Sequence, residues 1–325
     1  MDNTYNDAAH SEQVYHGNIN SVEAAEDISR AYKTRAAYEL ISEEEYASVL
    51  YKLLDVVLNE NLTGDSDDWH NFAINFSQRS DYINACKVLD KGIEYHGHSV
   101  DLLADYIKYG MLCGEREKCA SFYEKLANMP STIMTWRGFD FSIDYLLLLV
   151  HQSVSQDEID ILREKINICI EKFIKRYPYD EQSYLAQAEV FLAFGEFDDA
   201  VGTLSDAMSK FSAPKCCLKY ADLMLPRGNF DEVIRATQLG ISYSAQEQAG
   251  VNVAYLFYLS ALAKDGKLHK EGGEAYNDEA RIKDIYLDYM LAEKSFDENR
   301  SAYIENIRNR TTLLSIKTGI PYKNE

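Results

Sequence analysis

Few residues of this chain have the types and spacing that catalysis or metal binding requires. His96 and His98 form a close pair, but no cysteine or carboxylate stands at ligand spacing from them. The adjacent acids Asp198 and Asp199 would open a helix, where carboxylates interact favourably with the helix dipole. The sequence has no glycine-rich phosphate loop and no GxSxG or HExxH motif. We therefore expect a protein that is not an enzyme, with no catalytic residues, no metal and no cofactor.

The composition limits which partners the chain can bind. Of its 325 residues, 33 are Lys or Arg and 53 are Asp or Glu, so the net charge is −20. Nucleic-acid interfaces and anionic membrane surfaces both require clustered positive charge. The apolar fraction of 46% is that of a folded protein. We therefore expect an acidic, folded protein with no direct nucleic-acid partner and no membrane partner.

Nothing near the N-terminus predicts export. The segment MDNTYNDAAHSEQ lacks the basic start and the apolar core of a signal peptide. The most apolar run, at residues 145–150, is too short to span a bilayer. We therefore expect a cytoplasmic protein whose six cysteines are reduced core residues. These cysteines are Cys86, Cys113, Cys119, Cys169, Cys216 and Cys217.

The elements that must position any site are helices, and residues 181–214 show their pattern most clearly. Large and small apolar residues recur there at spacings of three and four. The first run is Tyr184, Ala188 and Phe191, and the second is Ala200, Leu204 and Ala207. Gly195 separates the two runs, and Pro214 begins the next element. The pattern predicts a hairpin of two closely packed antiparallel helices, and in its length and these residues it resembles a tetratricopeptide repeat.

The resemblance implies an all-α fold, a right-handed superhelix (α-solenoid) of tetratricopeptide-like antiparallel helical hairpins with helical caps. We expect the repeat array to cover residues 65–264. Its units would lie at 66–99, 100–132, 133–180, 181–213 and 214–246, and a last unit would start at 247–264. Around the array we expect a disordered polar tail at 1–20, a degenerate capping hairpin at 21–64, capping helices at 265–318 and a tail at 319–325.

The capping hairpin at 21–64 only partly follows the repeat pattern. We place Tyr38 and Tyr51 at signature positions of this degenerate unit. Ser42, followed three residues later by Glu45, predicts a capping box at the start of its second helix.

The next units carry their own departures. Ser66 or Asp67 is expected to cap the helix that follows. The repeat at 100–132 has Ile107 and Gly110 where the family usually has a small residue and an aromatic. Most of the 24 tyrosines fall at core positions. The tyrosines that are candidates for surface positions are Tyr82, Tyr109, Tyr243 and Tyr258.

The resemblance also implies where a ligand would lie. In such arrays the first helix of each hairpin lines the inner surface. Carried over position by position, the groove candidates are Asp67, His70, Asn71, Asp101, Asp105, Lys108, Arg137, Asp140, Gln182, Glu189, Lys219 and Asp222. Less polar members of the same surface are Ile74, Ala104, Leu185, Ala186 and Leu218.

The predicted function is a protein–protein interaction scaffold or adaptor that binds a peptide or protein segment in this groove. The charges of Asp67, Asp101 and Asp105 would add in a concave site and favour a segment with Lys or Arg. The alternative is that these acids only keep the groove soluble. Two other functions stay open, a peptide-sensing regulatory protein and an accessory subunit of a larger bacterial complex.

Overall fold

The computed structural model describes residues 19–247, 253–296 and 300–322. It divides the chain into two compact units, Met1–Arg176 (unit 1) and Tyr177–Glu325 (unit 2). The described residues form the α-helices α2–α16 and two short 3-10 helices. Among them a single bridge joins Ser21 to Thr63, and no strand forms. The prediction of an all-α fold is confirmed, whereas the tail predicted at 1–20 lies almost wholly outside the described residues.

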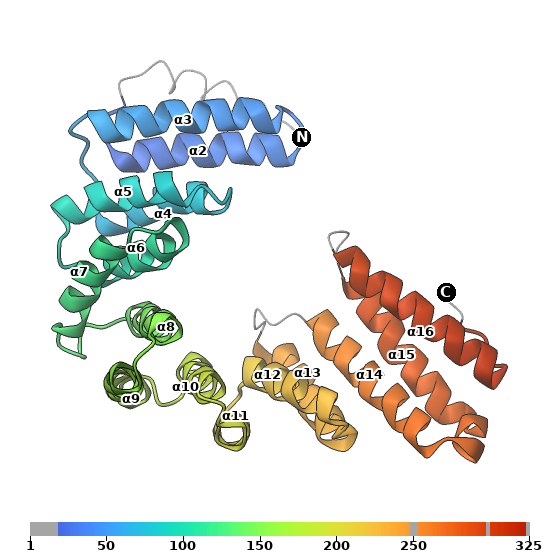
Figure 1. Cartoon of the computed structure of the whole chain (residues 1–325). Helices are drawn as coiled ribbons and strands as arrows, with labels where there is room; N and C mark the ends of the chain where they lie inside the picture. The colour runs from blue at the N-terminus through green and yellow to red at the C-terminus, as the bar shows by residue number, and fades with distance from the viewer. Residues whose placement is uncertain (1–18, 248–252, 297–299, 323–325) are drawn as a thin grey trace. The chain divides into compact units, whose positions relative to one another are not determined.

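Unit 1 consists of antiparallel helix pairs stacked in chain order (Figure 1). Its helices are α2 (Val22–Ala37), α3 (Glu43–Asn59), α4 (Ser66–Ser77), α5 (Tyr82–Tyr95), α6 (Val100–Cys113), α7 (Arg116–Ala127), α8 (Trp136–Gln152) and α9 (Gln156–Arg176). The first helix of each pair also contacts the first helix of the next pair, α2 with α4, α4 with α6 and α6 with α8. We call the surface made by α4, α6 and α8 the first-helix face.

Side chains next to the helix ends decide where these helices begin. The Ser42 hydroxyl accepts a hydrogen bond from the backbone N–H of Glu45, and the Glu45 carboxylate accepts one from Ser42, so the predicted capping box is confirmed. At α4 the box is instead made by Asp65 and Asp68. The predicted cap at Ser66 or Asp67 is wrong, because the Asp65 carboxylate already accepts the orphan N–H groups at the start of the helix.

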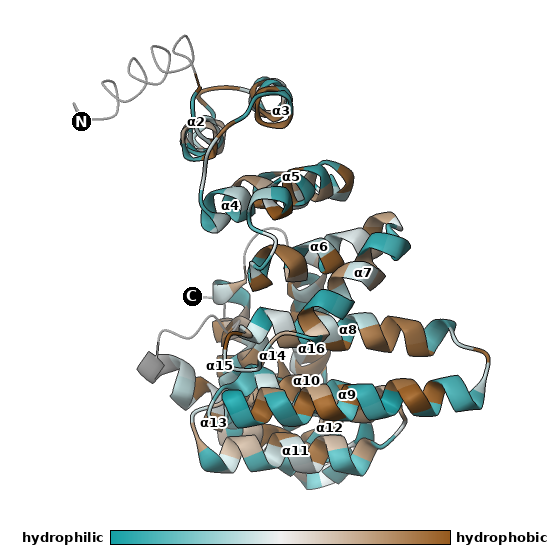
Figure 2. Cartoon of the chain, turned by 90° about the vertical axis from the view of Figure 1, so that its left-hand side faces the viewer, coloured by the Kyte–Doolittle hydropathy of each residue, from teal (hydrophilic) through white to brown (hydrophobic). Residues whose placement is uncertain are grey.

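In the core of unit 1, large side chains pack against glycine and alanine residues, which leave room for them. Trp69, Phe72 and Ala73 of α4 are fully buried. A Cβ at Gly92 would lie 2.8 Å from Trp69, so only glycine lets α5 pack this closely against the indole. Apolar and polar residues alternate around the longer helices α8 and α9 (Figure 2). The helices therefore pair through their apolar faces.

The unusual residues of the repeat at 100–132 have a packing reason. Ile107 is fully buried, and a Cβ at Gly110 would lie 2.6 Å from the Sγ of Cys119. Cys119 of α7 therefore occupies the space that the aromatic side chain would have filled at position 110. The hairpin still forms, although the large residue is at position 107 and the small one at position 110, the reverse of the usual repeat.

Three tyrosines of unit 1 lie where the pattern did not place them. Tyr38 follows the last residue of α2 and is 74% exposed, and Tyr51 is 44% exposed, so their predicted signature roles are wrong. The chain turns directly after Tyr38, where Glu39 has a positive φ of 56°. Tyr109, a predicted surface candidate, is 6% exposed and belongs to the core.

Unit 2 continues the hairpin architecture with longer C-terminal helices. Its elements are α10 (Glu181–Ala193), α11 (Phe197–Lys210), α12 (Pro214–Met224), η1 (Leu225–Arg227), α13 (Phe230–Glu247), α14 (Val253–Glu271), η2 (Gly273–Asn277), α15 (Glu279–Ser295) and α16 (Ser301–Thr318). The helix α14 runs to Glu271, and the chain turns at Gly272 and Gly273, which both have positive φ.

The hairpin of α10 and α11 matches its sequence pattern closely. Ala188, Ala200 and Ala207 are fully buried, and Tyr184 is buried beside them. Gly195 has a φ of +76° directly after α10, a conformation that glycine adopts without strain. Further along, Tyr258 was a surface candidate but is buried between α14 and the C-terminal helices.

Candidate functional site

The first-helix face brings together three of the predicted groove residues, His70, Asp105 and Arg137. They come from α4, α6 and α8, whose starts are set by the caps Asp65, Ser99 and Thr135. The Asp105 Oδ2 atom pairs with the His70 Nδ1 atom, and its Oδ1 atom lies 2.9 Å from the Arg137 Nη2 atom. We call these three residues the α4–α6–α8 network.

The contacts determine how the protons are arranged. The Arg137 Nη1 atom lies 3.2 Å from the His70 Nε2 atom and can only donate, so Nε2 accepts. The proton of a neutral His70 then sits on Nδ1 and is donated to the Asp105 carboxylate. The network thus holds one anion, one cation and one neutral imidazole. Its charges cancel.

Burial makes these pairings necessary. The Asp105 side chain is 1% exposed, compared with 15% for His70 and 23% for Arg137. A buried carboxylate without a partner costs several kcal/mol, of the order of 3 or more. Asp105 is therefore held by two neighbouring hairpins, and it fixes the positions of α4, α6 and α8 relative to one another.

The other candidates on this face keep contact with water. Asp67 and Asn71 are exposed, and Asp101 accepts a hydrogen bond of 2.8 Å from the Thr135 hydroxyl. The ammonium group of exposed Lys108 lies 4.8 Å from the centre of the Phe141 ring. Asp140 is half-buried on α8. These polar groups surround the network at the surface.

The structure corrects one part of the expected acidic groove. Asp67, Asp101 and Asp105 were expected to add three unpaired charges. Asp105 is instead fully buried and neutralised by Arg137, since the repeat spacing brings α6 and α8 into contact. Ala104, predicted to face the groove, is also fully buried, as is Ala186 of unit 2 at 6% exposure.

In unit 2 two of the groove candidates form an exposed ion pair. The Lys219 Nζ atom of α12 lies 2.5 Å from the Glu189 Oε1 atom of α10, and both side chains are substantially exposed. Asp222 is exposed on α12, and the backbone N–H of Gln182 donates to the capping residue Asp180. Exposed ion pairs of this kind contribute little to stability.

A second buried network, in unit 2, was missed from the sequence. The Lys264 Nζ atom of α14 lies 2.7 Å from Asp284 Oδ2 and 2.8 Å from Asp288 Oδ2, both on α15. The Ser260 hydroxyl donates to Asp288 over 2.6 Å. Burial opposes the charge of Lys264, but the hydrogen bonds to the two carboxylates outweigh it and raise the pKa of the ammonium group. The sequence does contain a signal for this network, because Ser260 and Lys264, and likewise Asp284 and Asp288, stand one helical turn apart.

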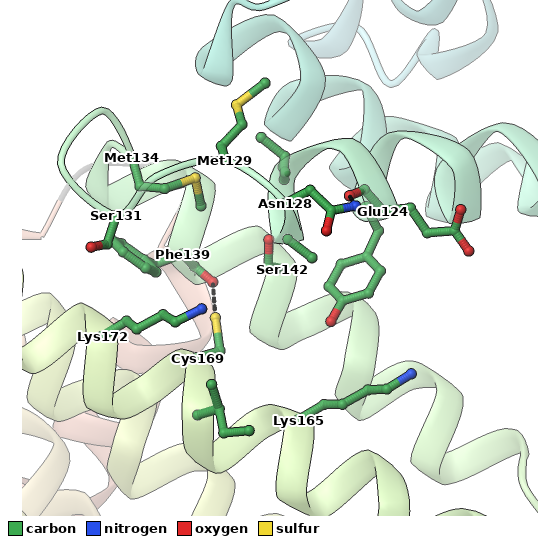
Figure 3. Close-up of a pocket in the computed structure, with 14 residues that line it drawn as sticks. Glu124, Asn128, Met129, Ser131, Met134, Phe139, Ser142, Lys165, Cys169 and Lys172 are labelled. Carbon is green, nitrogen blue, oxygen red and sulfur yellow. Dashed lines mark hydrogen bonds between the residues drawn. The ribbon is translucent and has the colours of Figure 1, made fainter.

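A pocket of about 450 Å³ opens between α7, α8 and α9, where the longer connection at residues 128–135 separates α7 from α8 (Figure 3). Its walls include Phe139 and Met134, and Lys165 and Lys172 extend from α9 on either side of Cys169 (Figure 3). The Cys169 thiol donates to the Phe139 carbonyl, and burial raises its pKa to about 12. The sulfur is therefore protonated at neutral pH and is a poor nucleophile.

The histidines and acids of the described residues do not assemble a metal site. Within 19–247, 253–296 and 300–322, no three His, Cys, Asp or Glu side chains gather as a metal site would require. His96 contacts the carbonyl oxygen of Gly64 at 2.8 Å, which gives this histidine a structural role. No helix in the described part of the chain is both long enough and apolar enough to cross a bilayer.

Comparison with known proteins finds likeness in structure only. No protein-family model and no curated protein matches the sequence. TTC0263, a thermophilic tetratricopeptide-repeat protein of Thermus thermophilus, aligns over 56% of this chain and 93% of its own, with 15% identity and a TM-score of 0.45. Human IFIT1, solved as a dimer with m7Gppp-AAAA, aligns over 93% of this chain and 66% of its own, with 12% identity and a TM-score of 0.42.

The TPR2AB domain of yeast Sti1, solved in complex with pHSP90, aligns over 77% of this chain and 98% of its own, with 12% identity and a TM-score of 0.33. The likeness of this chain to the family rests on its own helices. Paired helices of 12 to 14 residues, α4–α5, α6–α7 and α10–α11, pack through small residues such as Ala73, Ala188 and Ala200. The chain resembles tetratricopeptide-repeat proteins as a helical repeat protein.

Proposed function

We propose that this chain is a non-enzymatic scaffold that holds a peptide or protein segment against the first-helix face of unit 1. The observation that carries the proposal is the α4–α6–α8 network. A buried ion pair is seldom more stable than apolar side chains of the same volume. Here the network joins the first helices of three successive hairpins, and polar side chains around it remain accessible. A preorganised surface of this kind lowers the entropy cost of binding.

The chemistry of the face favours a segment with Lys or Arg. Asp67 and Asp101 occupy equivalent positions in the first turns of α4 and α6 and contact water. Asp105 adds nothing to this field, because Arg137 neutralises it. The segment we propose therefore carries a basic residue that meets these two carboxylates.

The test compares charge reversal on two surfaces of unit 1. Asp67→Lys with Asp101→Lys changes the first-helix face. Glu94→Lys with Glu117→Lys changes exposed acids on α5 and α7 by the same net charge. Proteins that co-purify with the native chain from its source are identified by mass spectrometry, and the partner is then titrated against each variant at two salt concentrations.

The first variant is expected to bind about tenfold more weakly at low salt, with a smaller loss at high salt, since two charge contacts are replaced by repulsion. The control is expected to bind like the wild type. Equal binding by all three proteins would place the partner elsewhere and refute the proposal. An equal loss in both variants would show a dependence on net charge alone, which also contradicts it.

A further inference from the structure

A groove of about 1130 Å³ lies within unit 2 between α14 and α16, and Phe230 of α13 also lines it. We call it the C-terminal groove. Phe230 reaches it because position 266 is glycine, where a Cβ would lie 2.7 Å from the aromatic ring. The groove is separate from the first-helix face of unit 1, and its role does not depend on the function proposed above.

The α16 wall of this groove carries two exposed aliphatic side chains among polar ones. Leu313 is 67% exposed and Ile316 is 76% exposed, one turn apart on the same side of the helix. Ile307 of the same helix packs into the core of unit 2, and buried Leu314 belongs both to that core and to the lining of the groove. Exposed aliphatic side chains next to a concavity are typical of an interaction surface. The helix therefore has one face in the core and a neighbouring face in the groove, where Leu313 and Ile316 are its exposed apolar side chains.

The rim of the groove is positive in an otherwise acidic protein. Lys270, Arg310 and Lys317 line it, and Asp265 is the one carboxylate among the described residues that do. Asp265 accepts a hydrogen bond of 3.0 Å from the Arg310 Nη1 atom, which accounts for one of the three cations. With His269 neutral, three cations and one anion leave a net charge of +2. The whole chain carries −20.

We infer that the C-terminal groove binds an amphipathic α-helix of a partner protein, with leucine-like residues on one face and Asp or Glu beside them. The aliphatic wall would receive the apolar face, and Lys270 and Lys317 would meet the acids. The α16 residues that line the groove run from Asn306 to Lys317, about 17 Å at 1.5 Å per residue. That length accommodates about three turns of a bound helix.

A nucleic acid fits the same groove less well. Single strands bind through stacking on exposed aromatic rings, whereas the phenyl and phenol rings of this groove already have partners, Phe230 on Gly266 and Tyr276 under the Lys317 ammonium group. Three cations also provide few phosphate contacts, and the strong negative charge of the chain opposes a polyanion. RNA and a second copy of this chain are therefore alternatives for the experiment to detect.

The test uses a displayed library of helical peptides of about 14 residues, selected against the full chain. The groove variant is Leu313→Ser with Lys317→Glu. The matched control is Leu287→Ser with Lys283→Glu, an exposed Leu and Lys four residues apart on α15. All four positions are at the surface, and circular dichroism checks that each variant folds. Selected peptides are titrated by fluorescence anisotropy against the three proteins.

The expected peptides have Leu, Ile or Phe at spacings of three and four with flanking Asp or Glu, and bind the groove variant at least about tenfold more weakly than the control. The inference is overturned if no selected peptide requires Leu313 and Lys317 for binding, or if the selected peptides are basic. So would binding of a single-stranded RNA that the groove variant loses. Sedimentation showing a wild-type dimer that the groove variant dissociates would make a second copy the occupant and also overturn it.

Discussion

Units 1 and 2 each contain a buried ionic network, but the two networks are balanced in opposite ways. In unit 1 a single fully buried carboxylate, Asp105, is held by Arg137 and His70 from two other helices. In unit 2 a single ammonium group, Lys264, lies between two carboxylates of one neighbouring helix. The first network has one anion with two partners, a guanidinium group in an ion pair and an imidazole in a hydrogen bond. The second has one cation with two acceptors.

This difference predicts how each unit responds to the loss of a partner. The Asp105 side chain is fully buried, so its charge is balanced by its two partners and not by solvent. In unit 2 the side chain of Asp284 is 55% exposed, and Asp288 keeps its hydrogen bond from Ser260. Solvent and a hydroxyl can therefore replace part of what Lys264 provides. The unit 1 network is the less tolerant of the two.

The largest effect is expected from Arg137→Met. The change leaves Asp105 buried with only His70 as a partner, and we expect the free energy of unfolding to fall by about 3 kcal/mol. The measurement is the urea midpoint followed by circular dichroism. An unchanged midpoint would show that the Asp105 carboxylate does not depend on its guanidinium partner.

The control for this variant removes the charge that Arg137 balances. Asp105→Asn added to Arg137→Met leaves a neutral amide that His70 can still contact, so part of the lost stability should return. If Asp105→Asn lowers the free energy of unfolding of Arg137→Met by as much as it lowers that of the wild type, the two side chains are not coupled.

A smaller effect is expected from Lys264→Met in unit 2, about 2 kcal/mol at about pH 8, since Asp284 reaches water and Ser260 still donates to Asp288. The matched control is Lys283→Met, which removes an exposed ion pair with Glu279 on α15. A loss in Lys264→Met no larger than that of the control would contradict a buried network in unit 2.

The pH dependence of the same variant provides a second readout. Burial opposes the charge of Lys264, yet the hydrogen bonds to Asp284 and Asp288 outweigh it, so its pKa in the folded state is raised above the ordinary value of 10.5. A raised pKa contributes stability that is complete below the unfolded pKa and is lost as the pH rises through the folded one. The difference in stability between wild type and Lys264→Met should therefore shrink above pH 10.5. A difference that stays constant well above that pH would argue against an ionised lysine as the source.

The smallest effect is expected from Glu189→Gln. This change breaks the exposed pair with Lys219 on the first helices of unit 2, and we expect about 0.5 kcal/mol or less. The midpoint in urea is measured as for Arg137→Met. A loss approaching that of Arg137→Met would mean that the ion pairs of the two units do not differ in the way their burial indicates.

The local pattern of the sequence was sufficient to predict the hairpins. Ala188, Ala200 and Ala207 were expected in the interior and are fully buried, because spacings of three and four place residues on one side of a helix wherever it packs. The capping box of Ser42 and Glu45 was equally predictable, since its two hydrogen bonds join residues only three apart.

The sequence predicted which residues belong to the candidate site but not the contacts between them. His70, Asp105 and Arg137 were each placed on a first helix by the repeat register. Their contacts join residues 35 and 67 positions apart, and the sequence does not state how closely the helices approach. The missed pairing of Lys264 with Asp288 depends in the same way on how α14 and α15 meet.

The sequence by itself determined the helical hairpins, the capping box of Ser42 and Glu45 and the buried alanines of α10 and α11, because these depend on spacings of a few residues. Only the tertiary structure decided which charged side chains are buried and paired. Asp101 and Asp105 stand one helical turn apart on the same helix, yet the first is half-buried beside Thr135 and the second is fully buried against Arg137. Whether a carboxylate is a surface charge or a neutralised core group depends on how much water neighbouring helices exclude, and that is set by packing between hairpins.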